Sequence, residues 1–262
     1  MRLYRSLGWL DLSVRYTIDD RIGVWVPLAL RSYDAEFVAD YEEDVVKQLA
    51  LRTERMRGGI TLVDCGADIG LMSCKLAARI KNVERIFAFE PSEVSFPHLQ
   101  RNLEAIPIET LAINSAVSDF VGVGALRFPL HDPESEHARF LVKDPLGSVS
   151  VTRIDDLGIP GGGNLLMKID VEGAELQVVN GAERTISTAG NFALMFEAHK
   201  GQVMRSGIDP GTIVSRIASF AAIKASVAEL PSLSVDWGKP FFDQIPFASG
   251  NAALNVIVTK DI

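Results

Sequence analysis

The chain has 262 residues, of which 47% are apolar and 23% are charged. This length and composition suffice for one α/β domain with its own core and a small N-terminal appendage. The formal net charge is −8 and no basic stretch occurs, so we expect no nucleic-acid partner. The longest apolar run, residues 24–30, is too short to cross a bilayer, and we expect no integral membrane segment. Cys65 and Cys74 form no C-x-x-C motif, which argues against disulfides or structural zinc and favours a cytoplasmic location.

The appendage is predicted to span residues 1–57. Residues 14–18 and 23–26 flank a polar turn, a pattern typical of a β-hairpin. Residues 34–56 carry apolar side chains at a spacing near 3.6, which predicts a helix or helix pair with Asp34 as its N-cap. Charged residues of this segment are expected on a solvated helix face: Glu42, Glu43, Asp44 and Lys47.

Residues 60–90 predict a strand, a turn, a helix and a second strand. The apolar run at 60–63 is typical of a buried strand, and residues 71–80 have helical spacing. Residues 85–89 form the second apolar run, which Glu90 ends. Two parallel strands joined by a helix make up the half of a doubly wound sheet that binds a nucleotide at the carboxyl ends of its strands.

The turn of this unit has a specific chemistry. Gly66 is expected to let the backbone pass close to a ligand, and Gly70 to let the helix begin in tight packing. The carboxylate of Glu90 can accept hydrogen bonds from the two hydroxyls of a ribose. Asp68 stands where a dinucleotide fingerprint has a small residue near the pyrophosphate, and an acid there suits a cationic, phosphate-free ligand such as S-adenosylmethionine. An ordinary turn with incidental glycines is the alternative.

A third strand is predicted at residues 108–113. Asn114 follows it and can hydrogen-bond the edge of an adenine, although a simple turn residue explains it equally well. Residues 117–128 alternate around two glycines, which predicts an inserted hairpin. The polar residues 129–147 are long for a plain connection and form a candidate substrate loop.

Ionisable residues end the fourth and fifth predicted strands, at residues 165–171 and 191–198. They are Lys168, Asp170, Glu172, Glu197 and His199. Charges at the carboxyl ends of central strands lie in the ligand crevice rather than in the core, because burying them without a partner is costly. The sequence therefore predicts a reaction site at this edge of the sheet.

The remaining segments complete the predicted sheet. A helix is expected at residues 211–220, a sixth strand at 222–230 and a last strand at 254–260. The aromatic loop at 231–250 is either an apolar lid or a loop anchored by its rings. Residues 58–262 are thus predicted to form a Rossmann-like, doubly wound α/β domain, with a mostly parallel seven-stranded sheet and helices on both faces.

Several motifs occur in the order found in FkbM-type methyltransferases. They are DCGADIG at 64–70, AFEP at 88–91, NSAVSD at 114–119, RIDDL at 153–157, KIDVEGAE at 168–175 and FEAH at 196–199. The chain resembles this family over residues 60–199 and in its closing strands. The resemblance implies a class I S-adenosylmethionine-dependent methyltransferase that O-methylates a hydroxyl of a sugar, glycan or polyketide-type small molecule.

The resemblance also implies roles for the matching positions. Residues expected to bind the cofactor are Asp64, Gly66, Ala67, Asp68, Gly70, Glu90, Pro91, Asn114, Ser115 and Ala116. Within this set the turn would line the methionine end, Glu90 would hold the ribose, and the last three would flank the adenine. Asp170 and Glu172 would face the methyl donor and acceptor. Asp68 departs from the family pattern, where asparagine is commoner, but it still accepts hydrogen bonds.

The expected reaction is an in-line transfer of the methyl group, in which a base removes the proton of the acceptor hydroxyl. His199 has a suitable intrinsic pKa for that base, and Asp170 and Glu172 are alternatives. A variant of the mechanism places a divalent cation such as Mg²⁺ on Asp170, Glu197 and His199.

Two other classes of function remain open. A nicotinamide-dependent oxidoreductase shares the β-α-β start, although the G-x-G-x-x-G fingerprint does not occur here. A non-catalytic module could retain a degenerate cofactor fold. The acceptor is not identified by the sequence, and a homo-oligomer is compatible with it.

Overall fold

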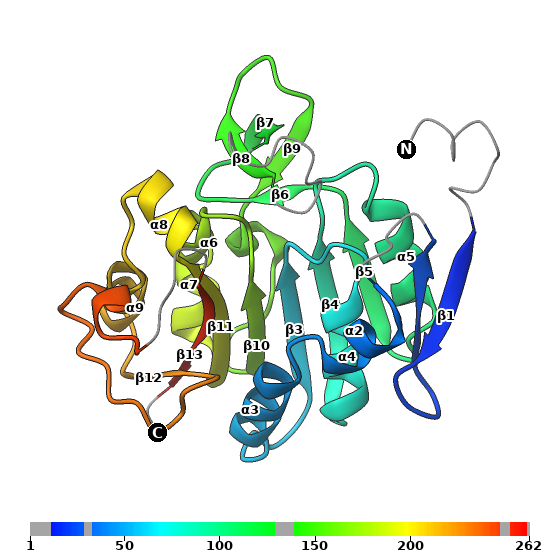
Figure 1. The fold of residues 1–262 in the computed structure, drawn as a ribbon, viewed down its shortest axis with the longest axis horizontal. Helices are drawn as coiled ribbons and strands as arrows, with labels where there is room; N and C mark the ends of the chain where they lie inside the picture. The colour runs from blue at the N-terminus through cyan, green and yellow to red at the C-terminus, as the bar shows by residue number, and fades with distance from the viewer. Residues whose placement is uncertain (1–11, 29–32, 129–138, 247–251, 261–262) are drawn as a thin grey trace.

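The computed structural model describes residues 12–28, 33–128, 139–246 and 252–260. Its centre is a sheet of seven strands: β3 (Ile60–Cys65), β4 (Val83–Phe89), β5 (Glu109–Ile113), β10 (Asn164–Ile169), β11 (Asn191–His199), β12 (Ile223–Val227) and β13 (Ala253–Lys260). Their order across the sheet is β12-β13-β11-β10-β3-β4-β5 (Figure 1). Strand β13 runs antiparallel to both neighbours, whereas the pairs from β11 to β5 are parallel. The predicted doubly wound, mostly parallel sheet is therefore confirmed.

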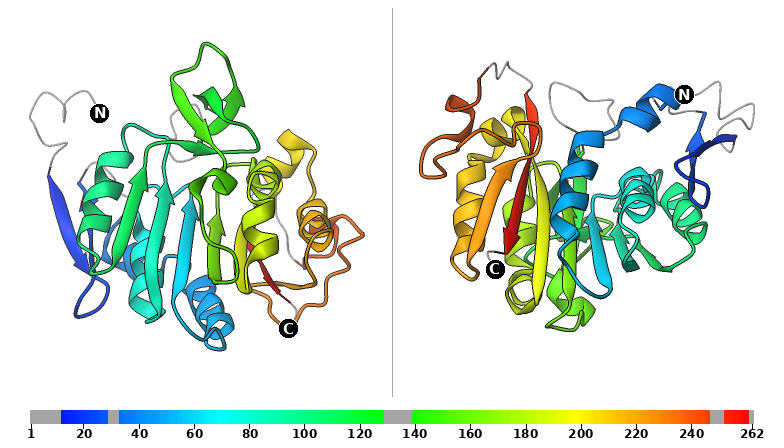
Figure 2. Two further views of the ribbon diagram at one scale, coloured as in Figure 1. Left: turned by 180° about the vertical axis from the view of Figure 1, so that it is seen from behind. Right: turned by 90° about the horizontal axis from the view of Figure 1, so that it is seen from below.

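Helices cover both faces of this sheet (Figure 2). One face carries α3 (Glu43–Thr53), α4 (Leu71–Arg79) and α5 (Phe96–Glu104), and the other carries α6 (Glu175–Asn180), α7 (Glu183–Thr188) and α9 (Pro210–Ala218). Successive strand residues point to opposite faces, so Leu62 joins the core under α3 to α5 while Val63 joins the core under α6 to α9. Burial on both faces explains why the central strands are continuous apolar runs.

The N-terminal hairpin is present as predicted. It consists of β1 (Ser13–Thr17) and β2 (Gly23–Pro27), which pair in antiparallel register. Asn102 of α5 fixes it to the main domain, because its Oδ1 accepts from the backbone N of Trp25 at 2.7 Å and its Nδ2 donates to the Trp25 carbonyl at 3.0 Å.

The predicted helix pair is α2 (Ala35–Asp40) followed by α3. Asp34 caps α2 as expected, since its side chain accepts from the backbone N of Phe37. The C-terminal end of α2 is held by Lys75, a buried lysine of α4 whose Nζ donates to the Tyr41 carbonyl at 2.6 Å. Helix α2 is thereby docked over the N-terminal part of α4. The division of the chain at residue 57 stays a prediction.

A second, four-stranded sheet stands above the carboxyl ends of the central strands (Figure 1). It contains β6 (Ala116–Val117), β7 (Gly122–Arg127), β8 (Phe140–Lys143) and β9 (Val149–Thr152), in the order β6-β9-β7-β8. The hairpin predicted within residues 117–128 is wrong: β6 pairs with β9, and β7 pairs with β8 and β9. Alternation identifies a strand, but it does not identify the partner.

Further differences concern connections. Helix α8 (Lys200–Ser206) follows β11 directly and was not predicted. Residues 129–138 of the candidate substrate loop and residues 247–250 of the aromatic loop lie outside the described residues. In the part of the chain that the structure describes, no helix is both long and apolar enough to cross a membrane.

Candidate active site

A cavity of about 370 Å³ lies at the carboxyl ends of β3, β4, β5 and β10. The strand order reverses between β3 and β10, and such a switch point is where doubly wound sheets bind their ligands. Most residues expected to bind the cofactor line this cavity: Gly66, Ala67, Asp68, Glu90, Pro91, Ser115 and Ala116. The other expected residues, Asp64, Gly70 and Asn114, do not line it.

These last three residues make structural contacts next to the residues that line the cavity. Asp64 is fully buried and its Oδ2 accepts from Ser73 Oγ at 2.6 Å. Gly70 caps α4 with a φ of 85°, and Asn114 donates through Nδ2 to the Glu90 carbonyl at 2.8 Å. Direct contact with the cofactor stays a prediction for them, while their structural roles are visible.

Only glycine fits at position 66, because another backbone segment passes close to it. Its φ is 79°, and a Cβ built on it would overlap the carbonyl oxygen of Asp170. The close backbone neighbour is thus the turn after β10, while Gly66 also lines the cavity and its predicted approach to a ligand stays a prediction. Gly66 therefore joins the turn after β3 to the segment that carries Asp170.

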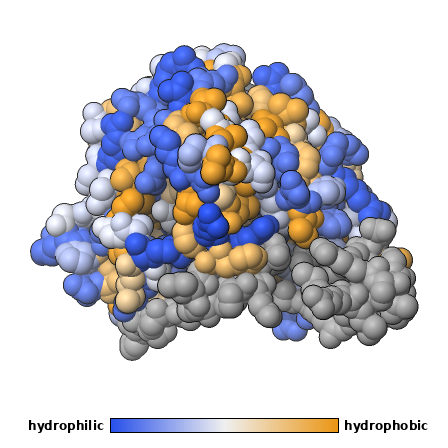
Figure 3. All heavy atoms as spheres, turned by 90° about the horizontal axis from the view of Figure 1, so that it is seen from above, coloured by the Kyte–Doolittle hydropathy of each residue, from blue (hydrophilic) through white to orange (hydrophobic). Residues whose placement is uncertain are grey.

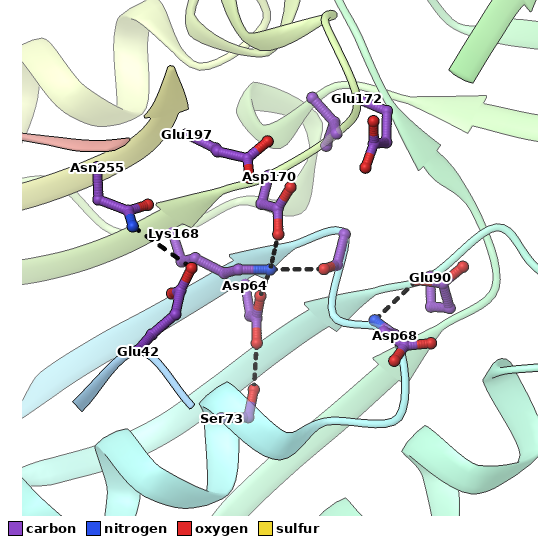
Figure 4. A network of polar contacts seen from close by, with 12 residues as sticks. Glu42, Asp64, Asp68, Ser73, Glu90, Lys168, Asp170, Glu172, Glu197 and Asn255 are labelled. Atoms are coloured by element: carbon purple, nitrogen blue, oxygen red, sulfur yellow. Dashed lines mark hydrogen bonds and ion pairs between the residues drawn. The ribbon is translucent and has the colours of Figure 1, made fainter. Parts of the chain in front are cut away.

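Glu90 ends β4 and is only 8% exposed (Figure 4). Its Oε2 accepts from the backbone N of Asp68, and its Oε1 from the backbone N of Ser92, each at 2.8 Å. Each oxygen keeps a lone pair for a further donor. Burial raises the pKa of Glu90 to about 7. Glu90 can therefore accept further hydrogen bonds, and its predicted contact with a ribose stays a prediction.

The appendage supplies an aromatic wall that sequence reasoning missed. Tyr33, Phe37 and Tyr41 line the cavity, with ring centroids 4.6 and 5.2 Å apart in succession. Tyr33 Oη donates to Asp68 Oδ2 at 2.8 Å, and burial raises the pKa of this phenol. In the sequence these three aromatic residues are spaced four apart, which indicates a shared helix face, but the same spacing is typical of side chains that pack into a core.

Lys168 lies at the centre of the polar network in Figure 4. It is 3% exposed, and its Nζ donates to the Gly66 carbonyl at 2.6 Å. The same ammonium lies 3.4 Å from Asp64 Oδ1 and 3.3 Å from Asp170 Oδ2. Burial alone would lower the pKa of Lys168, but the charges of these aspartates raise it well above its usual range. Lys168 thus links the turn after β3 to Asp170.

Asp170, Glu172 and Glu197 form a group, here called the carboxylate group, in which one oxygen of each lies within 4.8 Å of the others. Gln202 of α8 is the shared donor of the two glutamates: its Nε2 donates to Glu172 Oε2 at 3.1 Å and to Glu197 Oε2 at 2.8 Å. Burial and the charge of Asp170 raise the pKa of Glu172 to about 8 and that of Glu197 to about 9. Both glutamates therefore favour the protonated form at neutral pH.

His199 is placed apart from this group. Strand β11 ends at His199, which becomes the N-cap of α8, and its Nδ1 accepts from the backbone N of Gly201 at 3.0 Å. It does not line the cavity. Among the described residues the metal-compatible group combines Asp170 and Glu197 with Glu172 in place of His199. A bound cation stays a prediction.

Glu42 corrects the expectation of a solvated face. It is half-buried, its Oε1 accepts from Asn255 Nδ2 at 3.4 Å, and burial followed by the charge of Asp170 raises its pKa to about 7. Its φ of 48° turns the side chain toward the site (Figure 4). In the described part of the chain the non-glycine residues with positive φ are Glu42, Asp68 and Glu172, all at this site. Such conformations cost free energy and cluster at functional sites.

The comparisons with known proteins agree with this geometry. The model of the methyltransferase FkbM domain matches residues 64–223, well over half of the chain. The hexuronic acid methyltransferase AglP of Haloferax volcanii is 24% identical over 222 residues, covering 83% of this chain and 81% of that protein.

Solved structures give weaker likenesses. Methyltransferase FkbM from Methylobacillus flagellatus KT has a TM-score of 0.47 and 21% identity, and the match covers 74% of this chain but only 48% of that one. This chain thus spans about half the length of that protein. P. horikoshii TYW2 in complex with MeSAdo has a TM-score of 0.45 and 12% identity, covering 98% of this chain and 79% of that one. On the family match, the chain belongs to the FkbM methyltransferase family.

Proposed function

We propose that the protein binds S-adenosylmethionine in this cavity and O-methylates a hydroxyl of a sugar or glycan. The observation that carries the proposal is that Glu90 and the carboxylate group line one and the same cavity. This shared lining supports a single bound ligand that reaches both Glu90, which can accept from ribose hydroxyls, and carboxyl groups that can take up a proton. The relative whose name is hexuronic acid methyltransferase supports a sugar as acceptor.

The lining fits S-adenosylmethionine better than a dinucleotide. Its acids are Asp68, Glu90, Asp170, Glu172 and Glu197, and its basic side chains are Arg139 and Lys168. Lys168 is already paired with Asp64 and Asp170, so it offers a pyrophosphate little positive charge, whereas carboxylates such as Asp68 and Asp170 favour a sulfonium and an ammonium. The volume of about 370 Å³ is within the range of small-molecule sites.

When bound, S-adenosylmethionine supplies a sulfonium methyl group: the acceptor oxygen forms the new C–O bond, the C–S electron pair returns to sulfur, and the hydroxyl proton passes to a carboxylate. We propose that Glu172 is the carboxylate that takes up the hydroxyl proton. Its pKa of about 8 leaves a minority of Glu172 ionised at neutral pH, and this ionised form is the base, oriented by the Gln202 amide. The ion pair with Lys168 holds the Asp170 carboxylate in place, so its negative charge stays at a fixed position beside Glu172.

Calorimetric titration tests this proposal. We expect S-adenosylmethionine to bind and NAD⁺ not to bind. Glu90→Ala should weaken S-adenosylmethionine about tenfold or more, because two charge-assisted hydrogen bonds to the ribose are lost. Glu93→Ala removes an exposed acid three residues away and is the matched control. Binding of NAD⁺ without binding of S-adenosylmethionine would instead support the oxidoreductase.

A methyl-transfer assay separates an enzyme from a non-catalytic module. With labelled S-adenosylmethionine and a set of glycosides, label should enter an O-methyl product. Glu172→Gln should lower kcat about 10²-fold or more, since general base catalysis contributes at least that much. Cofactor binding without transfer to any glycoside would favour the non-catalytic module.

A further inference from the structure

A second cavity of about 470 Å³, here called the side groove, adjoins the first. It lies between the second sheet and helices α6 and α8, and it is lined from both sides. Leu141, Glu172 and Ala174 line both cavities. The side groove therefore meets the reaction site at Glu172, the residue to which we assigned the proton. A molecule seated in it would reach the carboxylate group from the side of α6.

Two cations line the side groove, each beside an aromatic ring. The guanidinium of Arg205 lies 4.4 Å from the ring centre of Phe140, and Lys143 Nζ lies 4.9 Å from that of Phe120. Arg205 also donates to the backbone carbonyl of Glu172. Neither cation forms an ion pair with a carboxylate of the described residues.

Both cations are exposed, and neither has an ion-pair partner in the part of the chain that the structure describes, although the net charge of the chain is −8. The acids of the lining are Glu172 and Asp119, so two cations face two acids, whereas the first cavity has five acids and two basic side chains. The side groove is therefore the less acidic of the two cavities and the better place for an anion. Arginine presents a planar fork of N–H donors that matches a carboxylate.

Gln177 adds a polar group without a partner. It lines the side groove, and its Oε1 is buried without a hydrogen bond from any described residue. Leaving such an acceptor unsatisfied is unfavourable, and a ligand hydroxyl would satisfy it. Figure 3 shows the molecule from above, and hydrophobic and hydrophilic residues are intermixed on that face. Aromatic rings with an amide and charged donors are suited to a polar ring compound rather than to a lipid.

Building on the methyl transfer proposed above, we propose that the side groove binds the acceptor, and that the acceptor is a sugar carrying a carboxylate that Lys143 and Arg205 recognise. The hydroxyl to be methylated then lies at Glu172, and another sugar hydroxyl donates to Gln177. Lys143 and Arg205 are specificity residues and take no part in the movement of the proton.

The test compares matched pairs of acceptors with labelled S-adenosylmethionine. The uronides are the methyl glycosides of glucuronic, galacturonic and mannuronic acid, and each is paired with its neutral hexoside. We expect at least one uronide to be methylated with a kcat/KM tenfold or more above that of its neutral partner. Lys143→Ala and Arg205→Ala should each reduce this ratio at least fivefold, mainly by raising KM for the uronide. Lys47→Ala, an exposed lysine on α3 away from the groove, should leave it unchanged.

The outcomes separate the two proposals. Absence of S-adenosylmethionine binding in wild type would overturn the proposed function itself. With the methyl donor bound, transfer to none of the uronides, equal use of the neutral sugars, or an unchanged ratio in both variants would overturn the side groove as a carboxylate site. A 6-sulfated hexoside used in preference to every uronide would likewise overturn the choice of carboxylate.

Discussion

Replacement of Lys168 by methionine is expected to destabilise the protein strongly. The substitution keeps the side-chain length but removes the ammonium between Asp64 and Asp170. Asp64 is 0% exposed and its Oδ1 has no hydrogen-bond partner among the described residues, so without the ammonium its charge keeps only the hydrogen bond from Ser73 Oγ. Breaking a buried ion pair by removing one partner costs about 3–5 kcal/mol, a large part of the 5–15 kcal/mol typical of a domain.

Urea denaturation of wild type and Lys168→Met measures this difference. Asp64→Asn combined with Lys168→Met removes both charges, and its loss should fall short of the sum of the two single losses by about 2 kcal/mol or more. Lys47→Met, at an exposed position on α3, should change stability by less than about 0.5 kcal/mol. A loss below about 1 kcal/mol in Lys168→Met, or strict additivity in the double variant, would refute the reasoning.

Four further results are expected. The affinity for S-adenosylmethionine should fall as the pH drops below about 7, because Glu90 gains a proton there and becomes a weaker acceptor; Glu90→Gln should remove this dependence in a calorimetric pH series. Burial raises the pKa of Glu197 to about 9, so its contribution to stability is present below pH 4.5 and is lost as the pH rises to 9. Glu197→Gln should therefore melt about 3 °C or more above wild type at pH 9 and show no gain at pH 5, and a gain of equal size at both values would contradict this. EDTA should leave transfer unchanged, because Gln202 and Lys168 already donate to the carboxylate group, whereas a loss restored by Mg²⁺ would reinstate the metal hypothesis. Gly66→Ala should lower stability by at least about 1 kcal/mol and weaken cofactor binding, since its φ of 79° disfavours a side chain; a fully active and equally stable variant would contradict the tight turn.

The sheet was predictable because each central strand is buried on both faces. Apolar runs such as residues 60–63 and 85–89 then stand out without any knowledge of their partners. The second sheet was mispredicted for the opposite reason. Strand β6 has two residues and pairs with β9, far along the chain, so local alternation carries no record of the pairing.

The site was predictable where a residue follows a parallel strand. Glu90, Asp170 and Glu197 end three strands of one sheet, and topology alone brings them to one edge. His199 also ends a strand, but the chain turns there into α8, a helix that the sequence did not indicate. Glu42 was missed because its left-handed backbone conformation interrupts the helical pattern and is invisible in composition.

The contacts of Lys168 could not be predicted from the sequence for a different reason. The sequence marked it as a charge at a strand end, but its contacts with Gly66 and Asp64 follow from the register of β3 against β10. Register is a long-range property that one strand alone does not reveal. The side groove likewise depends on the packing of the second sheet against α8.

We propose that one cavity holds the methyl donor, with its ribose at Glu90 and its sulfur toward the carboxylate group. A crystal structure of the protein with S-adenosylhomocysteine tests it most directly. We predict both ribose hydroxyls within hydrogen-bond distance of the Glu90 carboxylate, and the sulfur facing Asp170 and Glu172. A nucleoside bound elsewhere, or one whose ribose makes no contact with Glu90, would contradict the account.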